Sequence, residues 1–401
     1  MGNVERNLRL IYVFQLLKSL QLFGAVTVPF YLEWGGLDYT RMFVLEGAYS
    51  LFMFVLEVPT GAIADRFGRK WSLVLGAAFS GVAFAMFGLV RSYPWFFVAN
   101  LLCAVGATCI SGADQALLYD TLLVAKRAEE GRRVLSRFQA IGSVGLMVGF
   151  PLGSLLAGAS FFPRPQSLAL VFFLSGIVFA LSILPLLFVT EPERAKPMRY
   201  PLREGVSGVR LLLAPGRLRR LTFSYATISA TGFFMFWFYQ SLAREAAMPL
   251  AWNGPIGAGL SLLGMLLLWN AARLEGWLGL PRLLTITALL PALLYLGLAV
   301  YRPPPFAFSA AFIIVGMKLL REPLLSDLIN KLVESRNRAT VLSGVSMIER
   351  AVVFSLYPLV GLAADHALSL AFAGLGMVTL LFAVLLRGPL LQDHPMTDPQ
   401  V

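Results

Sequence analysis

Residues 167–189 read SLALVFFLSGIVFALSILPLLFV, a stretch of 23 residues without a charged side chain. An α-helix rises 1.5 Å per residue, so about 20 apolar residues are needed to cross the hydrocarbon core of a bilayer. This stretch is therefore predicted to span a membrane. Similar apolar stretches recur from one end of the chain to the other.

The composition of the whole chain also indicates a membrane protein. Of its 401 residues, 58% are hydrophobic and 14% are charged, whereas soluble domains have about 45–50% apolar and about 25% charged residues. These proportions exclude a soluble globular protein, a disordered chain and a collagen-like fibre. Cys103 and Cys109 lie in one apolar run and are predicted to be small core residues, not a disulfide framework. With two peripheral histidines, no metal site is expected.

Twelve membrane spans are predicted, which makes the fold class an all-α integral membrane protein. They lie at residues 8–32, 40–61, 71–91, 94–121, 135–160, 167–189, 219–243, 254–273, 282–301, 305–328, 339–364 and 368–387. Glycine and proline residues typical of turns separate several of them. An even number of spans places both termini on the same side of the membrane.

The positive charges predict which side that is. The segments on the side of the termini carry 24 Lys and Arg residues, and the loops on the other side carry five. Because Lys and Arg accumulate on cytoplasmic loops, both termini are predicted to be cytoplasmic, in a multi-pass protein of the cell membrane. The net charge of +11 then reflects topology, and nucleic acid is not expected as a partner.

A polar stretch divides the spans into two groups of six. Residues 191–218 are predicted to be a cytoplasmic linker between an N-terminal bundle at 1–190 and a C-terminal bundle at 219–388, with a cytoplasmic tail at 389–401. The two bundles are also related in sequence. A shift of 207 residues aligns LLYD at 117–120 with LLSD at 324–327. Repeated halves of this kind predict a pseudo-twofold axis along the membrane normal and a substrate site between the halves.

The loop after the second span carries the most specific motif, GAIADRFGRK at residues 61–70. It resembles the signature G-x-x-x-D-R-x-G-R-K/R of the major facilitator superfamily in every fixed position. The resemblance implies a secondary transporter that works by alternating access. The stretches LEVPTG at 56–61 and ALLYD at 116–120 are similar to those of the drug-efflux subgroup. The resemblance also implies that Asp65, Arg69 and Asp120 form a charge cluster that holds the halves in the outward-open state. The candidate gating residues are Gly61, Asp65, Arg66, Gly68, Arg69, Lys70 and Asp120.

Span five carries a row of glycines. Gly142, Gly145, Gly149 and Gly153 share one face of the predicted helix, and Pro151 follows Phe150 near its end. The pattern partly resembles the antiporter motif of the superfamily's exporters. Small residues on one face also allow two membrane helices to approach closely. The glycines are therefore explained equally well by export and by helix packing.

Ionisable residues inside membrane spans are costly and are candidates for function. Asp114 and Glu349 are acids at membrane depth, one in each half, and could carry a proton. Asp114 has no basic neighbour on its own span and is the better candidate, although a structural ion pair remains the alternative. The candidate residues of the substrate or proton pathway are Lys18, Asp114, Trp237, Tyr239, Lys318, Arg321, Glu322, Glu349 and Arg350.

Two functions follow from these residues. The first is proton-coupled export of amphiphilic or drug-like small molecules, favoured by the aromatic and methionine-rich stretch FFMFWFYQ at 233–240. Against it, span four lacks the arginine that the superfamily's drug–proton antiporters usually carry there. The alternative is a facilitator or symporter of a small anionic metabolite or lipid, with Lys18, Arg321 and Arg350 as anion ligands.

Other classes of protein find no support in the sequence. There is no catalytic Ser-His-Asp set, metal cluster or nucleotide-binding glycine loop, so neither an enzyme nor a cofactor is expected. The expected partners are a small-molecule substrate, protons and membrane lipids, and the chain is expected to be a monomer.

Overall fold

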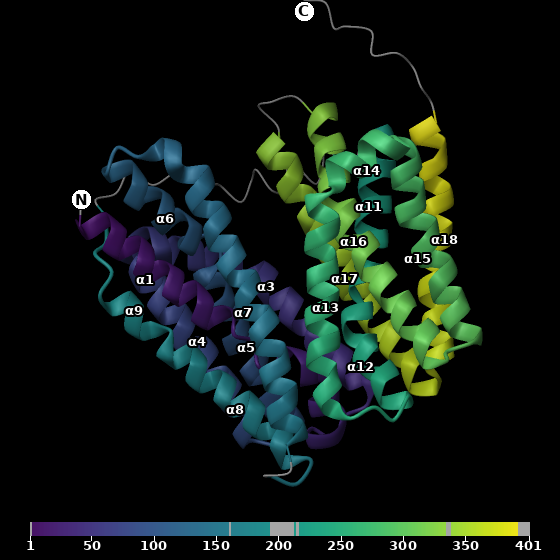
Figure 1. Cartoon of the computed structure of the whole chain (residues 1–401), viewed down its shortest axis with the longest axis horizontal. Helices are drawn as coiled ribbons and strands as arrows, with labels where there is room; N and C mark the ends of the chain where they lie inside the picture. The colour runs from purple at the N-terminus through teal and green to yellow at the C-terminus, as the bar shows by residue number, and fades with distance from the viewer. Residues whose placement is uncertain (1, 160–161, 193–211, 214–215, 334–337, 392–401) are drawn as a thin grey trace, which may run out of the picture. The chain divides into compact units, whose positions relative to one another are not determined.

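The computed structural model describes residues 2–159, 162–192, 212–213, 216–333 and 338–391 (Figure 1). Within these residues all regular structure is helical, and no strand is present. The chain divides into two compact units, which are described separately. The first consists of Met1–Tyr200 and Trp237–Leu262, and the second of Pro201–Phe236 and Leu263–Val401. The boundaries predicted at 190, 218 and 388 stay a prediction.

The helices of the first unit follow the predicted spans. They are α1 (Gly2–Ser19), η1 (Gly24–Val26), α2 (Thr27–Pro29), η2 (Phe30–Trp34), α3 (Tyr39–Phe67), α4 (Arg69–Leu89), α5 (Tyr93–Ile110), α6 (Ala113–Val124), η3 (Ala128–Glu130), α7 (Gly131–Gly158), α8 (Gln166–Leu181) and α9 (Ile183–Leu187). Parts of α12 (Met235–Glu245) and α13 (Asn253–Trp269), with η4 (Leu250–Trp252) between them, complete this unit.

The second unit contains the remaining helices. They are α11 (Arg217–Phe233), α14 (Ala271–Leu278), α15 (Leu280–Val300), α16 (Pro304–Leu332), α17 (Arg338–His366) and α18 (Leu368–Leu391). Among the described residues, nine helical segments are long and apolar enough to cross a membrane. The other predicted spans correspond to α3, α16 and the pair α11–α12. Both α3 and α16 carry several charged residues, and α11 and α12 meet at Phe234.

Each unit has an apolar core built from several helices. In the first unit, side chains of α1, α4, α6 and α7 form it, among them Ile11, Leu73, Leu117 and Phe138. In the second, side chains of α11, α15, α16 and α17 do so, among them Leu221, Leu284, Leu325 and Val345. The predicted sequence repeat agrees with the helices at this point, since the residues of α7, shifted by 207, lie within α17.

Two spans of the first unit are broken at membrane depth. The helix α1 ends at Ser19, and the chain turns before η1 begins at Gly24. The helices α5 and α6 are separated at Ser111 and Gly112, where Gly112 has a φ of 76°. A side chain is strained in this left-handed conformation, which explains the glycine. Broken helices at membrane depth are typical of the ion and substrate sites of transporters.

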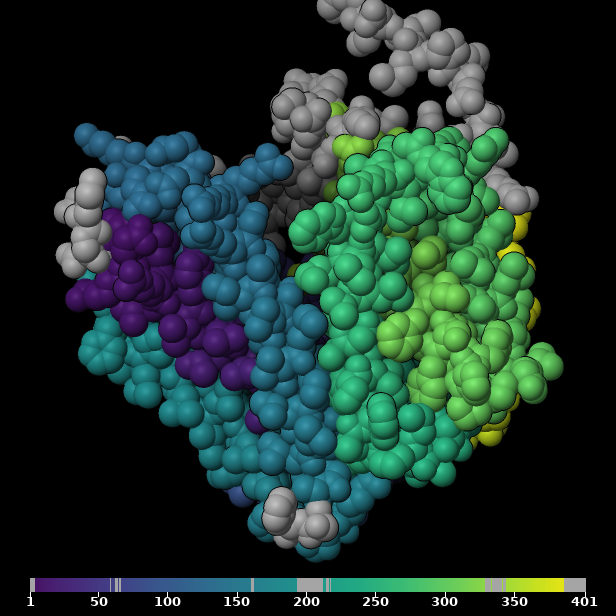
Figure 2. All heavy atoms as spheres, viewed as in Figure 1, coloured from purple at the N-terminus to yellow at the C-terminus, as the bar shows by residue number. Residues whose placement is uncertain are grey.

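The glycine face of α7 packs against the break that follows α1. A Cβ atom added at Gly145 would lie 2.7 Å from Ser19 Cβ, and one added at Gly149 would lie 2.9 Å from the backbone nitrogen of Gln21. In Figure 2 the blue atoms of α7 accordingly lie beside the purple atoms of α1. The close approach that the sequence predicted is therefore confirmed, and the neighbour of the glycine face is the bend of the first span.

We expect Gly149→Ala to destabilise the protein, because the added methyl group meets backbone atoms that cannot rotate away. Overpacking of this kind costs about 1–3 kcal/mol. Gly374→Ala in α18 is the matched control, since no described atom lies within 4 Å of a Cβ there. It should be neutral or gain up to about 1 kcal/mol from helix propensity. Thermal unfolding in detergent measures both, and equal melting temperatures would contradict the tight contact.

Candidate functional site

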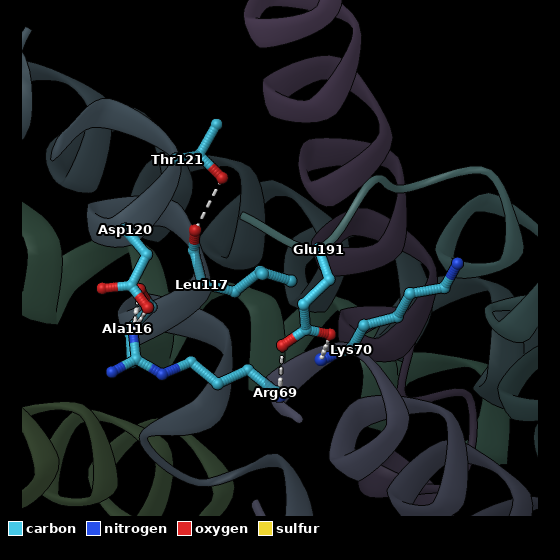
Figure 3. Close-up of polar contacts among 7 residues, drawn as sticks. All are labelled: Arg69, Lys70, Ala116, Leu117, Asp120, Thr121 and Glu191. Carbon is cyan, nitrogen blue, oxygen red and sulfur yellow. Dashed lines mark hydrogen bonds and ion pairs between the residues drawn. The ribbon is translucent and has the colours of Figure 1, made fainter. Parts of the chain in front are cut away.

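The signature motif between α3 and α4 forms a polar cluster inside the first unit (Figure 3). The guanidinium of Arg69 makes an ion pair with Asp120 and donates a hydrogen bond to the carbonyl oxygen of Ala116, both on α6. Lys70 donates to the carbonyl oxygens of Leu187 and Val189, at 2.9 and 2.8 Å. The motif thus joins α4 to the cytoplasmic ends predicted for spans four and six.

Glu191 completes this cluster and was not singled out from the sequence. Its carboxylate accepts hydrogen bonds from the backbone N–H groups of Arg69 and Lys70, at 2.8 and 3.0 Å (Figure 3). These are the first residues of α4, whose N–H groups have no partner within the helix and carry the positive end of its dipole. A carboxylate is therefore well placed here. Its position at the start of the polar linker was the signal that could have revealed it.

The other predicted gating residues are placed as follows. Gly68 ends α3 with a φ of 112°, a conformation that favours glycine. Arg66 lies 5.4 Å from the ring of Phe67. No described atom lies within 4 Å of a Cβ added at Gly61, so a close helix approach is not seen there. The side chain of Asp65 lies outside the described residues. The gating role of the cluster stays a prediction.

A second cluster lies where the two broken spans of the first unit meet. The ammonium of Lys18 makes an ion pair with the carboxylate of Asp114, and their side chains are 16% and 8% exposed. The Lys18 nitrogen also lies 5.4 Å from the ring centroids of both Phe14 and Phe138. Asp114 has no basic neighbour on its own helix, as the sequence indicated. Its partner comes from α1.

Helix geometry supports both charges of this pair. Lys18 is in the last turn of α1, and Asp114 is in the first turn of α6. Cations are stabilised at the negative C-terminal end of a helix and anions at the positive N-terminal end. Asp114 also accepts a hydrogen bond of 2.7 Å from the backbone N–H of Gln115. The two helix breaks therefore create the positions that hold a buried ion pair.

The second unit contains a buried cation with a different environment. Arg321 of α16 is 1% exposed. Its Nη1 donates to the carbonyl oxygen of Leu284 at 2.6 Å and to the hydroxyl of Thr287 at 3.1 Å, both on α15. Its Nε and Nη2 have no hydrogen-bond partner among the described residues.

The predicted acid of the second unit has another partner. Glu349 accepts a hydrogen bond of 2.6 Å from the Ser229 hydroxyl, and the ion pairs of the described residues do not join it to Arg321. Lys318 and Glu322 lie 3.7 Å apart on one face of α16, as their spacing predicted. Arg350, next to Glu349, is half-buried.

The two aromatic candidates lie on α12 with a polar neighbour that the sequence did not single out. Tyr239 is buried and Trp237 is half-buried. Gln240 donates to the carbonyl oxygen of Gly24 and accepts from the N–H of Val28, both at 3.0 Å. Gln240 thus supplies partners to backbone groups that the break after α1 releases from helical bonding.

Glu46 of α3 is a further ionisable residue within a membrane span, outside the set of pathway candidates. It receives a hydrogen bond from Tyr31 of η2. Tyr31 itself is 2% exposed. Nothing in the spacing of two spans indicates that these side chains meet, so the contact required the structure.

Helices long enough to cross a membrane, breaks within them and buried charges at the breaks together define a membrane transporter. The family model of the Major Facilitator Superfamily matches residues 22–348. The chain belongs to this superfamily, and the resemblance found in its signature motif is confirmed.

Several curated relatives support this assignment. Multidrug resistance protein 1 of Bacillus subtilis is 24% identical over 176 residues, which cover 44% of this chain and 42% of the relative. Multidrug resistance protein MdtH of Shigella boydii is 26% identical over 219 residues, covering 54% and 46%. Methyl viologen resistance protein SmvA of Salmonella typhimurium is 32% identical over 108 residues, covering 27% and 21%. The matched region thus spans less than half the length of each relative.

Solved structures show the fold. The nucleoside transporter NupG has a TM-score of 0.78 at 13% identity, covering 97% of this chain and 99% of the other. A bacterial homolog of the human lysosomal transporter Spinster, inward-facing and unoccupied, has a TM-score of 0.72 at 17% identity, covering 97% and 95%. The fold is that of twelve-span transporters, as predicted, and a transporter is not an enzyme.

Proposed function

We propose that this chain is a secondary transporter that exports amphiphilic or drug-like small molecules in exchange for protons by alternating access. The observation that carries the proposal is the buried pair of Lys18 and Asp114 between two phenyl rings. The relatives named for multidrug and methyl viologen resistance support the choice of substrate. The protein acts as a monomer among membrane lipids, with the substrate and protons as its partners.

Asp114 is suited to exchange a proton because its surroundings offer it two states. As a carboxylate it is neutralised by Lys18, and as a carboxylic acid it needs no counter-ion. Removing a partner from a buried ion pair is costly. A proton that binds Asp114 removes the negative partner of Lys18 and so changes the relative free energies of the two states. When Asp114 is protonated, the ammonium of Lys18 still faces two aromatic rings, which attract cations.

The geometry of the pair favours export of amphiphiles over the alternative, an anion facilitator that uses Lys18. An ammonium that already has a carboxylate partner offers an anion little attraction. The aromatic rings beside it are buried in the apolar core and stabilise the ammonium. In the first unit, therefore, the pair is better suited to a proton than to a metabolite anion.

The excess of Lys and Arg on one side supports cytoplasmic termini and a place in the cell membrane. Single cysteines at Glu129, between α6 and α7, and at Tyr301, between α15 and α16, test this orientation. Both positions are exposed, and the native Cys103 and Cys109 are buried. A maleimide that cannot cross the membrane should label Tyr301→Cys on intact cells, and Glu129→Cys only after permeabilisation. The opposite pattern would refute the orientation.

Flux through purified protein in liposomes tests the function. With an acidic interior, the vesicles should accumulate ethidium, detected by its fluorescence on enclosed DNA. Ethidium is a permanent cation, so it is not trapped passively by a pH gradient. Nigericin, which exchanges K⁺ for H⁺ and collapses the gradient, should stop the accumulation. Accumulation that does not depend on the gradient would contradict proton-coupled exchange and favour a facilitator.

A further inference from the structure

The 207-residue shift that aligns LLYD at 117–120 with LLSD at 324–327 also aligns Asp114 of α6 with Arg321 of α16. In the first unit, Asp114 forms an ion pair with Lys18. The acid position of the first unit is therefore a cation position in the second.

This exchange places a buried cation in the second unit. In the first unit the charge of Asp114 is neutralised by Lys18. In the second unit the acid position holds the guanidinium of Arg321, whose hydrogen bonds among the described residues go to Leu284 and Thr287 and not to a carboxylate. A charge taken out of water at this depth needs an opposite charge or a full set of hydrogen bonds.

The hydrogen bonds of Arg321 are incomplete on one side of the guanidinium. Nη1 has two acceptors on α15, whereas Nε and Nη2 have none among the described residues. Nε and Nη2 are neighbouring donors of one planar group. Such an edge matches the two oxygens of a carboxylate, which it can bind through two parallel hydrogen bonds.

The nearby carboxylates are engaged elsewhere. Glu349 accepts a hydrogen bond from Ser229, at 2.6 Å. Glu322 lies 3.7 Å from the ammonium of Lys318, and its side chain is 50% exposed. Neither carboxylate hydrogen-bonds the two open donors of Arg321. The two open donors of Arg321 thus have no carboxylate partner in the part of the second unit that the structure describes.

We propose that Arg321 forms an anion-binding site inside the second unit, which takes the carboxylate of an amphiphilic small molecule. The two open N–H donors bind the carboxylate oxygens. The side chains around Arg321 on α11, α15 and α16 are apolar and suit the organic part of the ligand. The site rests on the proposed function and extends it, because it adds acids to the amphiphiles that the transporter accepts.

Binding of an acid and its uncharged analogue tests the site. Naphthalene-2-acetate and naphthalene-2-acetamide have the same ring and differ in charge. Isothermal titration of the full-length protein in uncharged detergent should show that the acid binds about tenfold more tightly or better, as expected for charge-assisted hydrogen bonds. Arg321→Gln should remove this preference and keep the affinity for the amide, which shows that the variant is folded. Arg321→Lys should keep part of the preference for the acid, because an ammonium has the same charge but lacks the planar edge.

Arg282→Gln at the exposed start of α15 is the matched control, since it removes the same charge from the same unit. It should keep the full preference for the acid. The proposal is wrong if the wild type binds acid and amide equally, or if the preference persists in Arg321→Gln. Displacement of the acid by an equal concentration of phosphatidylglycerol would assign the site to a lipid headgroup and overturn the proposal as well.

The outcome is separable from that of the flux experiment. Binding in detergent involves no gradient and no cation, whereas ethidium exchange involves no anion. Equal binding of acid and amide leaves proton-coupled exchange standing. If proton-driven ethidium accumulation fails but the wild type still binds the acid more tightly than the amide, the proposed Arg321 site is supported and the proton exchange is not.

Discussion

Replacing Asp114 by asparagine is expected to abolish the gradient-driven accumulation of ethidium in proteoliposomes while leaving its binding largely intact. Asparagine has nearly the same size as aspartate, and its amide oxygen can still accept the hydrogen bond from Gln115. It cannot bind or release a proton. The variant should therefore move ethidium only down its own gradient, at a rate that nigericin does not change.

The matched control is Glu129→Gln, which removes an acidic group from an exposed position near the start of α7. Its uphill transport should equal that of the wild type. Uphill transport that survives in Asp114→Asn would show that another acid carries the proton. Glu349 is the next candidate, and uphill transport that survives in the variant lacking both acids would show that neither of them carries the proton.

Lys18→Met is expected to destabilise the protein by about 3–5 kcal/mol, the usual cost of removing one partner of a buried ion pair. Methionine keeps the apolar contacts with Phe14 and Phe138 but leaves the carboxylate of Asp114 without its counter-ion. The double variant Lys18→Met/Asp114→Leu should regain most of this loss, because no buried charge remains. Unfolding of all variants in mixed detergent micelles gives the interaction energy from the double-mutant cycle.

The cycle distinguishes a buried pair from an exposed one. Arg41 and Asp38 form an ion pair whose side chains are 59% and 45% exposed, and Arg41→Met serves as the control. Exposed pairs contribute about 0–1 kcal/mol. A loss of this size in Lys18→Met would show that water reaches the Lys18–Asp114 pair, and the proposed switch between paired and protonated states would lose its basis.

The spans and the motif were predictable because they depend on neighbours in the chain. Apolar stretches of sufficient length identified the helices, and the spacing of glycines identified the packing face of α7. The family signature led to the ion pair of Arg69 with Asp120. In these cases a periodic pattern or a family resemblance is sufficient to predict which residues form a helix, a packing face or an ion pair.

The remaining contacts join residues far apart in the sequence, which no local pattern encodes. Lys18 and Asp114 are 96 residues apart, and Gln240 contacts a backbone carbonyl 216 residues away. The break at Gly112 is also invisible in hydropathy, because it lies within one long apolar stretch. The sequence therefore placed Asp114 in the middle of a continuous helix. Its position at the positive end of α6 became apparent only from the structure.

The single carboxylate of the Lys18–Asp114 pair determines how membrane voltage acts on the proposed exchanger. The charges of the protein return to their starting positions in each cycle, so the charge moved equals that of the one proton that Asp114 carries minus that of the substrate. Exchange for an uncharged compound then moves one positive charge inward, and a potential of 100 mV contributes about 2.3 kcal/mol. Exchange of one proton for one monovalent cation moves no net charge. The cell's voltage thus drives the export of neutral compounds, whereas monovalent cations depend on the pH difference alone.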